Sequence, residues 1–554
     1  MRRDLARLGA DGFDVLVIGA GIYGVATAWD AVQRGLSVAL IDRGDIGGGT
    51  SFNNLKTVHG GLRSVQQGNV REMREFIRER RTWGRILPHL IHPLPFVVPT
   101  YRTPSRSRAA LRAALTLHNL VSFDRNDNPD PSKHLPAGRV ISRAACLDHG
   151  GGLSPEGITG GALWYDCQMY NTDRVTLAFA RSAADAGACV ANYVEARRFL
   201  LSGPRVIGVE ATDVLDGRDF EIRADLVVNA AGPWANDLLA RLPGAPVHLA
   251  AARLSKAMNV VTRRVPASAA VGGVARGRFL FMIPWREFSL VGTSHEPYAG
   301  EPDGLAVTRA DIDGFMRDVQ VAFPGAGLTT ADVRLVHRGL LPMVGSRGDE
   351  VRLLKASQIR DHRLDGAPGL MSVLGVRYTT ARHTAERAVD VAVGVLGRAT
   401  QRSRTAVTPL AGGAIDDFDD FLATAIASPR PAGVGPAVID RLVRSYGSEY
   451  TRLLDTMAAR PNDAVPLGRA CPVTSAEIRH AVRHEMAVTL SDAVLRRTEA
   501  GSAGHPGADA VNVAADVVRD ELGWTDERRR DEIARLERVY WIADGRTDAP
   551  AGEV

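Results

Sequence analysis

The feature of this chain that most constrains its fold is a glycine motif near the N-terminus, Gly19-Ala20-Gly21-Ile22-Tyr23-Gly24. The motif follows an apolar, β-branched run at 13–18 and opens a helix-like stretch at 25–33. A second strand-like run, 36–42, ends in an acid, Asp42. Strand, helix and strand within about thirty residues predict a parallel βαβ unit. In this context the motif predicts a dinucleotide-binding turn, with a Rossmann-like turn that binds no ligand as the alternative.

Each residue type in the motif has a chemical reason. Gly19 permits the tight turn, Gly21 lets a pyrophosphate approach the backbone, and Gly24 lets the helix pack on the strand. The N-terminus of the helix stabilises the negative charge of the phosphates. Asp42 is expected to accept hydrogen bonds from an adenosine ribose. The motif alone is compatible with either NAD or FAD.

Length and composition limit the class of protein. A chain of 554 residues exceeds what one hydrophobic core usually supports, so we expect two or three domains. Hydrophobic residues make up 45% and charged residues 24%, which excludes disordered, collagen-like and coiled-coil classes. The net charge of +5 indicates no class of partner. The sequence contains no zinc-binding spacing and no recognised nucleic-acid motif, so we expect neither a metal site nor nucleic-acid binding.

Three features bear on location. The four cysteines are scattered without a Cys-x-x-Cys pair, which fits a reducing compartment. The apolar stretch at 15–29 is not read as a signal peptide because Asp14 and Asp30 flank it, and no other segment reaches the ~18 apolar residues of a membrane span. We therefore expect a cytoplasmic protein, or one peripheral on the inner face of the cytoplasmic membrane. An arginine-rich stretch at 71–112 is either a solvated face or an interfacial helix that contacts anionic lipid.

The rest of the chain divides into two kinds of pattern. Strand-like runs at 225–229, 278–283 and 288–292 alternate with helical stretches, which is typical of mixed α/β architecture. After 408–413 the patterns become helical. A capping-box signature at 474–477 precedes one apolar residue every four, ending at Val494, and predicts one long helix over this stretch. The Gly- and Ala-rich segment 499–509 is expected to be the loop that follows it.

Several further segments occur in a characteristic order. They are 50–56 with Thr50, Ser51 and Lys56; His59-Gly60-Gly61-Leu62-Arg63; Asn229-Ala230-Ala231-Gly232-Pro233-Trp234; Ile283-Pro284-Trp285; Gly375-Val376-Arg377-Tyr378-Thr379-Thr380; and the helical tail around 477–497 and 521–524. In these segments the chain resembles the membrane-associated, FAD-dependent glycerol-3-phosphate dehydrogenases over nearly its whole length. The resemblance implies FAD as the cofactor. The run 224–234 is similar to the strand that returns to the dinucleotide in two-domain flavoenzymes, which favours FAD over NAD.

The resemblance also implies the fold and its boundaries. The expected fold class is α/β: a Rossmann-type FAD-binding domain and a mixed-sheet substrate domain, as in two-domain flavoproteins of the D-amino-acid-oxidase/glutathione-reductase type, plus a C-terminal all-helical domain. The FAD-dependent region is expected at 11–410. Its FAD-binding parts are about 11–100, 160–235 and 370–410, interleaved with a substrate domain at about 101–159 and 236–369. The helical domain is expected at 411–554.

The implied reaction oxidises the C2 hydroxyl of sn-glycerol 3-phosphate to dihydroxyacetone phosphate. Hydride passes to flavin N5 while a base takes the hydroxyl proton, and the electrons pass to a quinone. Beyond the glycine motif, the implied flavin contacts are Thr50, Ser51, Ala231, Gly232, Gly375, Thr379 and Thr380. The implied catalytic residues are Lys56, His59, Arg63, His295 and Arg377, and the implied substrate contacts are Arg63, Lys256, Asn259 and Arg377.

Among these, Arg63 is the expected phosphate ligand, because a guanidinium donates two hydrogen bonds to a phosphate at once. His59 and Lys56 are expected either to lie near the flavin or to have only a structural role in their loop. His295, like His337, is a candidate base or a structural histidine.

Three positions depart from the family, and all fall on the expected substrate side. Leu341 replaces an arginine that helps to bind the phosphate, Asn259 replaces a histidine proposed to take part in proton removal, and Ser64 replaces an aromatic residue. Two alternatives to the family reaction therefore stay open: a related flavin dehydrogenase or oxidase for another small hydroxy or amino compound, and a non-catalytic flavin-binding module. The expected partners are a small, anionic substrate, a quinone or other electron acceptor, a membrane surface and a second copy of the chain.

Overall fold

The computed structural model describes residues 1–65, 68–243, 253–347 and 350–541. Its first sheet contains the predicted βαβ unit: β1 (Gly12–Ile18), α2 (Ile22–Gln33) and β2 (Val38–Ile41). The strand order is β17-β18-β10-β1-β2-β7, with β8 and β9 paired at one end of β10. The remaining bounds are β7 (Cys189–Ala191), β8 (Val194–Ser202), β9 (Arg205–Asp213), β10 (Asp219–Asn229), β17 (Gln358–Asp361) and β18 (Leu370–Leu374).

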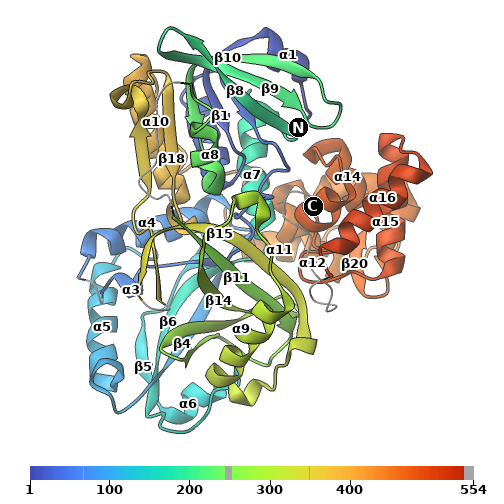
Figure 1. Ribbon diagram of the computed structural model, residues 1–554. Helices are drawn as coiled ribbons and strands as arrows, with labels where there is room; N and C mark the ends of the chain where they lie inside the picture. The colour runs from blue at the N-terminus through green and yellow to red at the C-terminus, as the bar shows by residue number, and fades with distance from the viewer. Residues whose placement is uncertain (66–67, 244–252, 348–349, 542–554) are drawn as a thin grey trace.

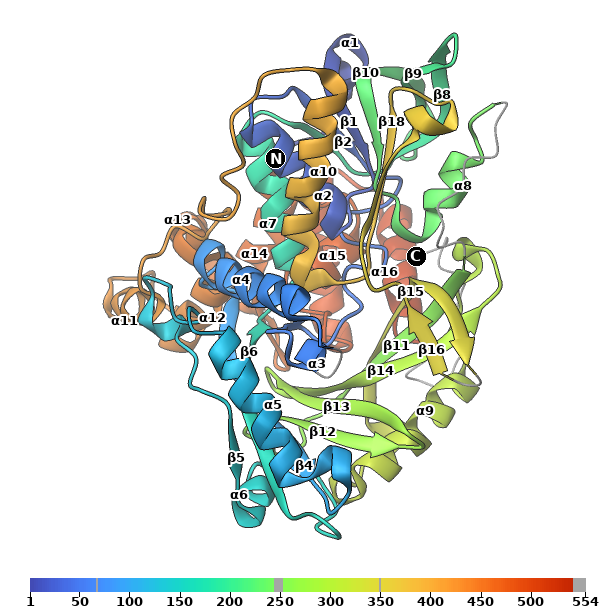
Figure 2. The same cartoon turned by 90° about the vertical axis from the view of Figure 1, so that its left-hand side faces the viewer.

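Both faces of this sheet are buried, which explains the continuous apolar run of β1. Val15 and Val17 pack under α2 and two further helices, α7 (Thr172–Asp185) and α10 (Ala381–Leu396), which lie side by side in Figure 2. Leu16 and Ile18 face the other way, toward the β8–β9 hairpin and the short helices α1 (Leu5–Ala10) and α8 (Ala235–Leu239). The central strands β18, β10, β1, β2 and β7 are parallel, and parallel strands covered on both faces are typical of α/β folds.

The second sheet lies below the first in Figure 1 and has the order β16-β15-β11-β14-β13-β12-β4-β6-β3, with β5 paired to β6. The sheet is mixed, because β12 pairs with β4 in parallel while its other described pairs are antiparallel. One face packs on α9 (Arg309–Ala322) and the other faces the interior. The bounds are β3 (Thr57–Val58), β4 (Ile91–Thr100), β5 (Arg139–Ile141), β6 (Gly160–Met169), β11 (Arg253–Arg263), β12 (Ala270–Ala275), β13 (Arg278–Trp285), β14 (Phe288–Tyr298), β15 (Val333–Arg347) and β16 (Glu350–Leu353).

The two sheets confirm the expected fold class. The expected domain boundaries stay a prediction, and two of them, 100 and 160, fall within the second sheet. Those positions are the end of β4 and the start of β6, which pair with each other along ten residues within the second sheet. The segments 91–100 and 160–169 therefore both belong to the second sheet. The two strands pair residues that are about seventy positions apart in the sequence. Local sequence patterns cannot predict pairing over such a distance.

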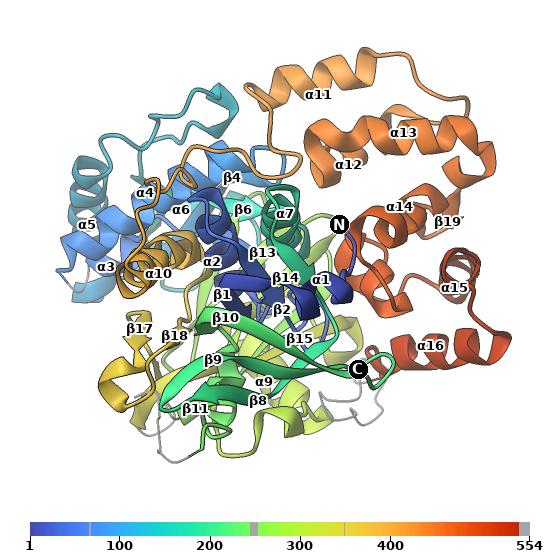
Figure 3. The ribbon, with the colours of Figure 1, turned by 90° about the horizontal axis from the view of Figure 1, so that it is seen from above.

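The C-terminal region is mainly helical and lies to one side of both sheets (Figure 1), where Figure 3 shows its helices in an arc. The helices are α11 (Phe418–Ala427), α12 (Pro436–Tyr446), α13 (Tyr450–Ala459), α14 (Ser475–Glu485), α15 (Ala508–Leu522) and α16 (Asp526–Arg538). A small hairpin, β19 (Pro466–Gly468) with β20 (Cys471–Thr474), interrupts them. The part of the expected helical domain at 542–554 lies outside the described residues.

The predicted capping box is present, since Thr474 and Glu477 exchange the expected bonds at the start of α14. The prediction of one helix through Val494 was wrong. The helix ends at Glu485, and Met486 takes a left-handed conformation with φ of 59°. The Asp492 carboxylate then accepts the N–H groups of Val488 and Thr489, both at 3.0 Å, and starts a separate π-helical turn at 492–497. Such side-chain bonds compete with helix propagation.

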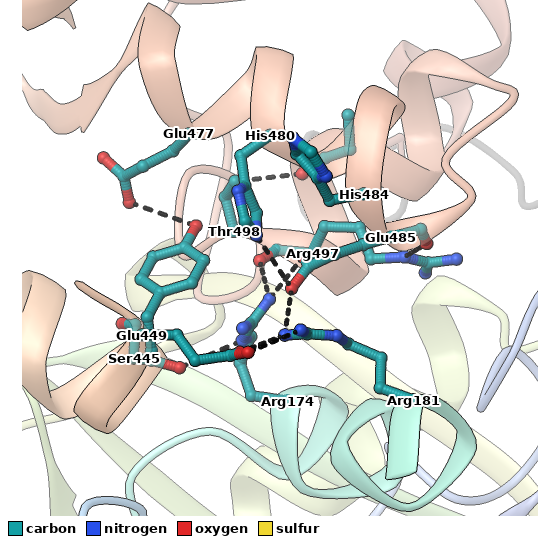
Figure 4. Close-up of polar contacts among 12 residues, drawn as sticks. Arg174, Arg181, Ser445, Glu449, Glu477, His480, His484, Glu485, Arg497 and Thr498 are labelled. Atoms are coloured by element: carbon teal, nitrogen blue, oxygen red, sulfur yellow. Dashed lines mark hydrogen bonds and ion pairs between the residues drawn. The ribbon is translucent and has the colours of Figure 1, made fainter. Parts of the chain in front are cut away.

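Buried ion pairs dock the C-terminal region on α7 (Figure 4). Arg174 lies 2.6 Å from Glu485, and Arg181 lies 2.7 Å from Glu449 and 3.3 Å from Glu485. Burial opposes ionisation of Glu485, but the charge of Arg174 and the neighbouring His480 hold its pKa well below the usual range. A buried carboxylate is costly unless it is paired, and the arginines that pair with Glu485 come from α7. The C-terminal helices therefore pack on the rest of the molecule through these ion pairs.

The arginine-rich stretch forms α4 (Val70–Ile86) and α5 (Arg108–Val121), with α3 (Leu62–Val65) and α6 (Arg143–Asp148) nearby. Arg74 and Arg81 pair with Asp124, which lies just beyond α5. The reading of this stretch as one solvated face is wrong for Arg80, which is buried and pairs with Asp166 at 2.6 Å. Within the described residues no helix is long and apolar enough to cross a membrane.

Candidate active site

A cavity of about 3200 Å³ runs from the glycine turn at the carboxyl end of β1 to the inner face of the second sheet. Its walls come from both sheets, from the loop at 42–55, and from α4, α5 and the segment after β18. Ligands of open α/β sheets bind beyond the carboxyl ends of the strands, which is where this cavity begins.

The glycines of the motif are required by the local geometry. Gly19 has φ of 105°, and a Cβ there would lie 2.6 Å from the carbonyl oxygen of Ala230. A Cβ on Gly24 would lie 1.7 Å from the carbonyl oxygen of Gly19. Gly21 lines the cavity and is the N-cap of α2, to which it supplies no side-chain hydrogen bond. The turn therefore brings backbone to the cavity at the positive end of a helix dipole, which fits a pyrophosphate.

Asp42 lies just after β2 and lines the same cavity. Its carboxylate accepts the N–H groups of Ala20 at 2.6 Å and Gly44 at 2.8 Å. Burial raises the pKa of Asp42, although these hydrogen bonds oppose the shift. Each carboxylate oxygen has a second lone pair, so the side chain fits the ribose hydroxyls predicted for it.

Six of the other seven predicted flavin contacts also line the cavity. They are Thr50, Ser51, Ala231, Gly232, Gly375 and Thr379. The Ser51 hydroxyl accepts the N–H of Ile22 at 2.9 Å, so the loop at 42–55 is tied to the first turn of α2. Thr380 is buried at the N-cap of α10, one residue behind the wall formed by Thr379. The glycine turn, Asp42 and the loop at 42–55 together fit the ADP half of FAD.

His59 occupies the cavity wall beside a buried carboxylate that the sequence did not reveal. Its Nδ1 lies 3.4 Å from Asp166, which also accepts the N–H of Gly60 at 2.7 Å and the guanidinium of Arg80 at 2.6 Å. Burial opposes ionisation of Asp166, but the hydrogen bond from His59 and the charge of Arg80 hold its pKa well below the usual range. Asp166 therefore stays charged and orients the imidazole.

Arg377 also reaches the cavity, and it is paired there. Its guanidinium donates to Glu72, whose other carboxylate oxygen accepts the Ser64 hydroxyl at 2.8 Å. Glu72 comes from α4, and no motif pointed to it. Arg63 lies in α3, but its side chain is outside the described part of the structure, so its predicted phosphate contact stays a prediction.

Two predicted basic residues lie elsewhere. Lys56 is fully buried behind the wall: its ammonium donates to the carbonyl of Phe52 at 2.8 Å, and burial lowers its pKa to about 8. Lys256 pairs with Asp311 of α9 at 2.9 Å. Strand alternation puts Lys256 on the α9 face of β11, whereas its neighbour Ala257 lines the cavity. Neither lysine is part of the described cavity wall, and the implied roles of Lys56 in catalysis and of Lys256 in substrate binding stay predictions.

The remaining predicted positions have mixed roles. Asn259 is buried in β11 and connects this strand to the loop at 42–55 and to β14, donating to Asn53 at 2.8 Å and accepting from Thr293 at 2.8 Å. His295 lines the cavity, with Nδ1 3.5 Å from the Ser255 hydroxyl. His337 also lines it, and burial holds its pKa well below the ordinary value, so its imidazole is neutral. Leu341 faces the cavity as an apolar side chain.

Comparison with known proteins agrees with this architecture. The family described as FAD dependent oxidoreductase matches residues 14–392, and the C-terminal domain of alpha-glycerophosphate oxidase matches residues 403–529. The glycerol-3-phosphate dehydrogenase of Synechocystis sp. is 30% identical over 537 residues, which cover 94% of this chain and 95% of that protein. Glycerol-3-phosphate dehydrogenase 2 of Mycobacterium tuberculosis is 32% identical over 542 residues, covering 96% and 89%.

A solved structure is similar over the same extent. The glycerol-3-phosphate dehydrogenase of Bacillus halodurans complexed with FAD superposes with a TM-score of 0.77 at 25% identity, covering 98% of this chain and 97% of that one. The L-alpha-glycerophosphate oxidase of Mycoplasma pneumoniae, with FAD bound, has a TM-score of 0.52 at 14% identity and covers 71% of this chain, which is a likeness of fold.

Proposed function

Because this chain belongs to the family of FAD-dependent oxidoreductases, we propose that it oxidises the C2 hydroxyl of sn-glycerol 3-phosphate to dihydroxyacetone phosphate. The observation that carries the proposal is one cavity whose lining includes both the glycine turn and His59 and Arg377, in a chain related over nearly its full length to glycerol-3-phosphate dehydrogenases.

The bound FAD would supply the hydride acceptor of the reaction. In the proposed site Gly19, Gly21 and Gly24 form the pyrophosphate turn, Asp42 binds the ribose, and the segments around Ser51, Gly232 and Thr379 surround the rest of the cofactor. Support comes from the lack of room for a Cβ at Gly19 and Gly24 and from the helix N-terminus that faces the cavity.

His59 is the proposed acceptor of the hydroxyl proton. Its Nδ1 is oriented by Asp166, and a histidine held in this way accepts a proton at Nε2. The charged Asp166 then stabilises the imidazolium that forms. His295 also lines the cavity and is the second candidate, whereas the clamped Asn259 has no basic group.

The proposed electron acceptor is a quinone that approaches along α5. Leu111 and Leu115 of this helix line the cavity together with Phe96 and Phe281, so the wall there is apolar. Leu117 and Leu120 of this helix and Phe123, just beyond its end, are 41%, 68% and 77% exposed. An exposed apolar edge with arginines beside it suits a peripheral contact with anionic lipid. A homodimer stays a prediction, to be checked by light scattering.

A second candidate function has one observation in its favour. Leu341 presents an apolar side chain to the cavity where the resemblance implies an arginine. A related flavin dehydrogenase that acts on a less anionic hydroxy or amino compound is therefore the alternative to the proposed substrate.

Product analysis tests the proposed function. Purified protein, sn-glycerol 3-phosphate and a soluble quinone analogue are expected to yield dihydroxyacetone phosphate and quinol in equal amounts. Glycerol, glycerate and small amino alcohols are assayed in parallel. Turnover of one of these compounds without turnover of glycerol 3-phosphate would favour the second candidate.

A further inference from the structure

Three side chains from separate parts of the chain form a hydrogen-bonded chain in the cavity wall. The carboxylate of Glu72, on α4, accepts the guanidinium of Arg377 at one oxygen and the hydroxyl of Ser64 at the other, the latter at 2.8 Å. All three side chains line the cavity, as does Phe76 one helical turn along α4. Glu72 therefore contributes a negative charge at the point where the resemblance implies a substrate-binding cation.

The pair is held in place from several directions. The backbone N–H of Arg377 donates to the Tyr23 hydroxyl at 3.0 Å, and that hydroxyl donates to the carbonyl of Arg377 at 3.0 Å. The guanidinium lies 5.2 Å above the Phe76 ring. The side chains of Glu72 and Arg377 are only 13% and 27% exposed, so solvent screens their interaction incompletely.

This geometry has an electrostatic consequence for an anionic substrate. A phosphate that approaches Arg377 meets a guanidinium already neutralised by a carboxylate, and it is repelled by that same carboxylate. Leu341, elsewhere in the wall, is apolar and does not contact a phosphate through a charge. By contrast, a hydroxyl or ammonium group on a substrate finds acceptors in Glu72 and in the Ser64 hydroxyl.

We propose that Glu72 is a specificity-determining residue that lowers the affinity of the site for a phosphorylated end group and admits uncharged small polyols as competing substrates. The inference rests on the proposed function, because it concerns the end of the substrate remote from the reacting carbon. Glu72 acts by occupying Arg377 and by its own charge. Ser64 is a positioning residue, since its hydroxyl holds the second carboxylate oxygen.

The test compares Glu72→Gln with the matched control Glu75→Gln on the same helix. Glu75 bonds to His383 at 2.7 Å and is not part of the described cavity wall, so its change removes an equal charge one turn away. The measured quantity is the ratio of kcat/KM for sn-glycerol 3-phosphate to kcat/KM for glycerol. In Glu72→Gln this ratio is expected to rise about tenfold through a lower KM for the phosphate ester, because one like charge has been removed beside the phosphate.

The control is expected to change the ratio less than about twofold, because Glu75 is bonded to His383 and does not line the described cavity. An unchanged ratio in Glu72→Gln would overturn the inference. So would an equal loss of kcat/KM for both substrates, which indicates a structural role, or an equal rise in Glu75→Gln, which indicates a general field effect.

A binding measurement separates this inference from the proposed function. Inorganic phosphate is titrated calorimetrically into each FAD-loaded protein, without turnover. Phosphate binding about tenfold tighter in Glu72→Gln than in the wild type supports the role of Glu72 even if glycerol 3-phosphate is not oxidised. Equal phosphate affinities in the two proteins would overturn that role even if glycerol 3-phosphate is a good substrate.

Discussion

Arg497 donates to both carboxylate oxygens of Asp45, with its two terminal nitrogens each 2.6 Å from an oxygen. Arg497 belongs to the C-terminal region, and Asp45 lies three residues after Asp42 in the loop that lines the cavity. Arg496 and Asn192 bond to the same carboxylate at 2.5 Å and 2.9 Å. Burial opposes the ionisation of Asp45, but the two guanidinium groups hold its pKa well below the usual range. The helical region thus anchors the loop proposed to bind the cofactor.

Replacing Arg497 with Met is expected to destabilise the protein by about 3 kcal/mol and to weaken FAD retention, because it removes the bidentate partner of a buried carboxylate. Arg441→Met is the control, since Arg441 pairs with Glu477 inside the C-terminal region. Urea unfolding and the flavin content after gel filtration are measured for both variants. Equal flavin retention in the two variants would argue against the anchoring role of Arg497.

Gly21→Val is expected to fold and to lose its flavin. A Cβ at Gly21 would meet only the Ser51 hydroxyl, at 3.1 Å, so the protein tolerates it better than the pyrophosphate does. At Gly24 the Cβ would collide with backbone, and Gly24→Ala is expected to impair folding itself. Circular dichroism and the flavin absorbance distinguish the two effects. A Gly21→Val protein that purifies fully yellow would contradict the assignment of the turn.

His59→Gln is expected to slow flavin reduction by about a hundredfold while FAD stays bound, because general base catalysis contributes about that factor or more. Stopped-flow absorbance under anaerobic conditions measures the reduction rate directly. His295→Gln serves as the comparison. A normal rate in His59→Gln with a slow rate in His295→Gln would transfer the role of base to His295.

The buried Lys56 is expected to make the free energy of unfolding rise with pH in the alkaline range. Burial lowers its pKa from 10.5 to about 8, so between these values the unfolded chain binds more protons than the folded one. Burial of the ammonium therefore lowers the free energy of unfolding by its full amount below pH 8. This destabilisation disappears as the pH rises toward 10.5. From pH 8 to 10 the free energy of unfolding of the wild type is expected to gain about 2 kcal/mol relative to Lys56→Met. Parallel pH profiles in urea unfolding experiments would contradict the shifted pKa.

The parts of the site that follow from the sequence are those built by contiguous residues. The glycine turn, α2 and Asp42 lie within one βαβ unit, so their spacing alone predicts their geometry. The capping box at Thr474 is local in the same way. The sequence also shows which residues of β11 alternate between its two faces. It does not show which of these faces α9 covers, and the packing of α9 decides where Lys256 lies.

Other parts of the site depend on contacts between distant residues. Glu72 and Arg377 are 305 positions apart, and Asp166 is 107 positions from His59, so no local pattern marks either pairing. The break at Met486 was missed because the apolar period continues across it, while the Asp492 carboxylate redirects the backbone.

We propose that this chain holds FAD in the cavity and reduces it with glycerol 3-phosphate. The most direct test is an anaerobic visible spectrum of the purified protein before and after addition of sn-glycerol 3-phosphate. The flavin band is expected to bleach, and a quinone analogue is then expected to restore it. A flavin band that dithionite bleaches but glycerol 3-phosphate leaves unchanged would contradict the proposed substrate.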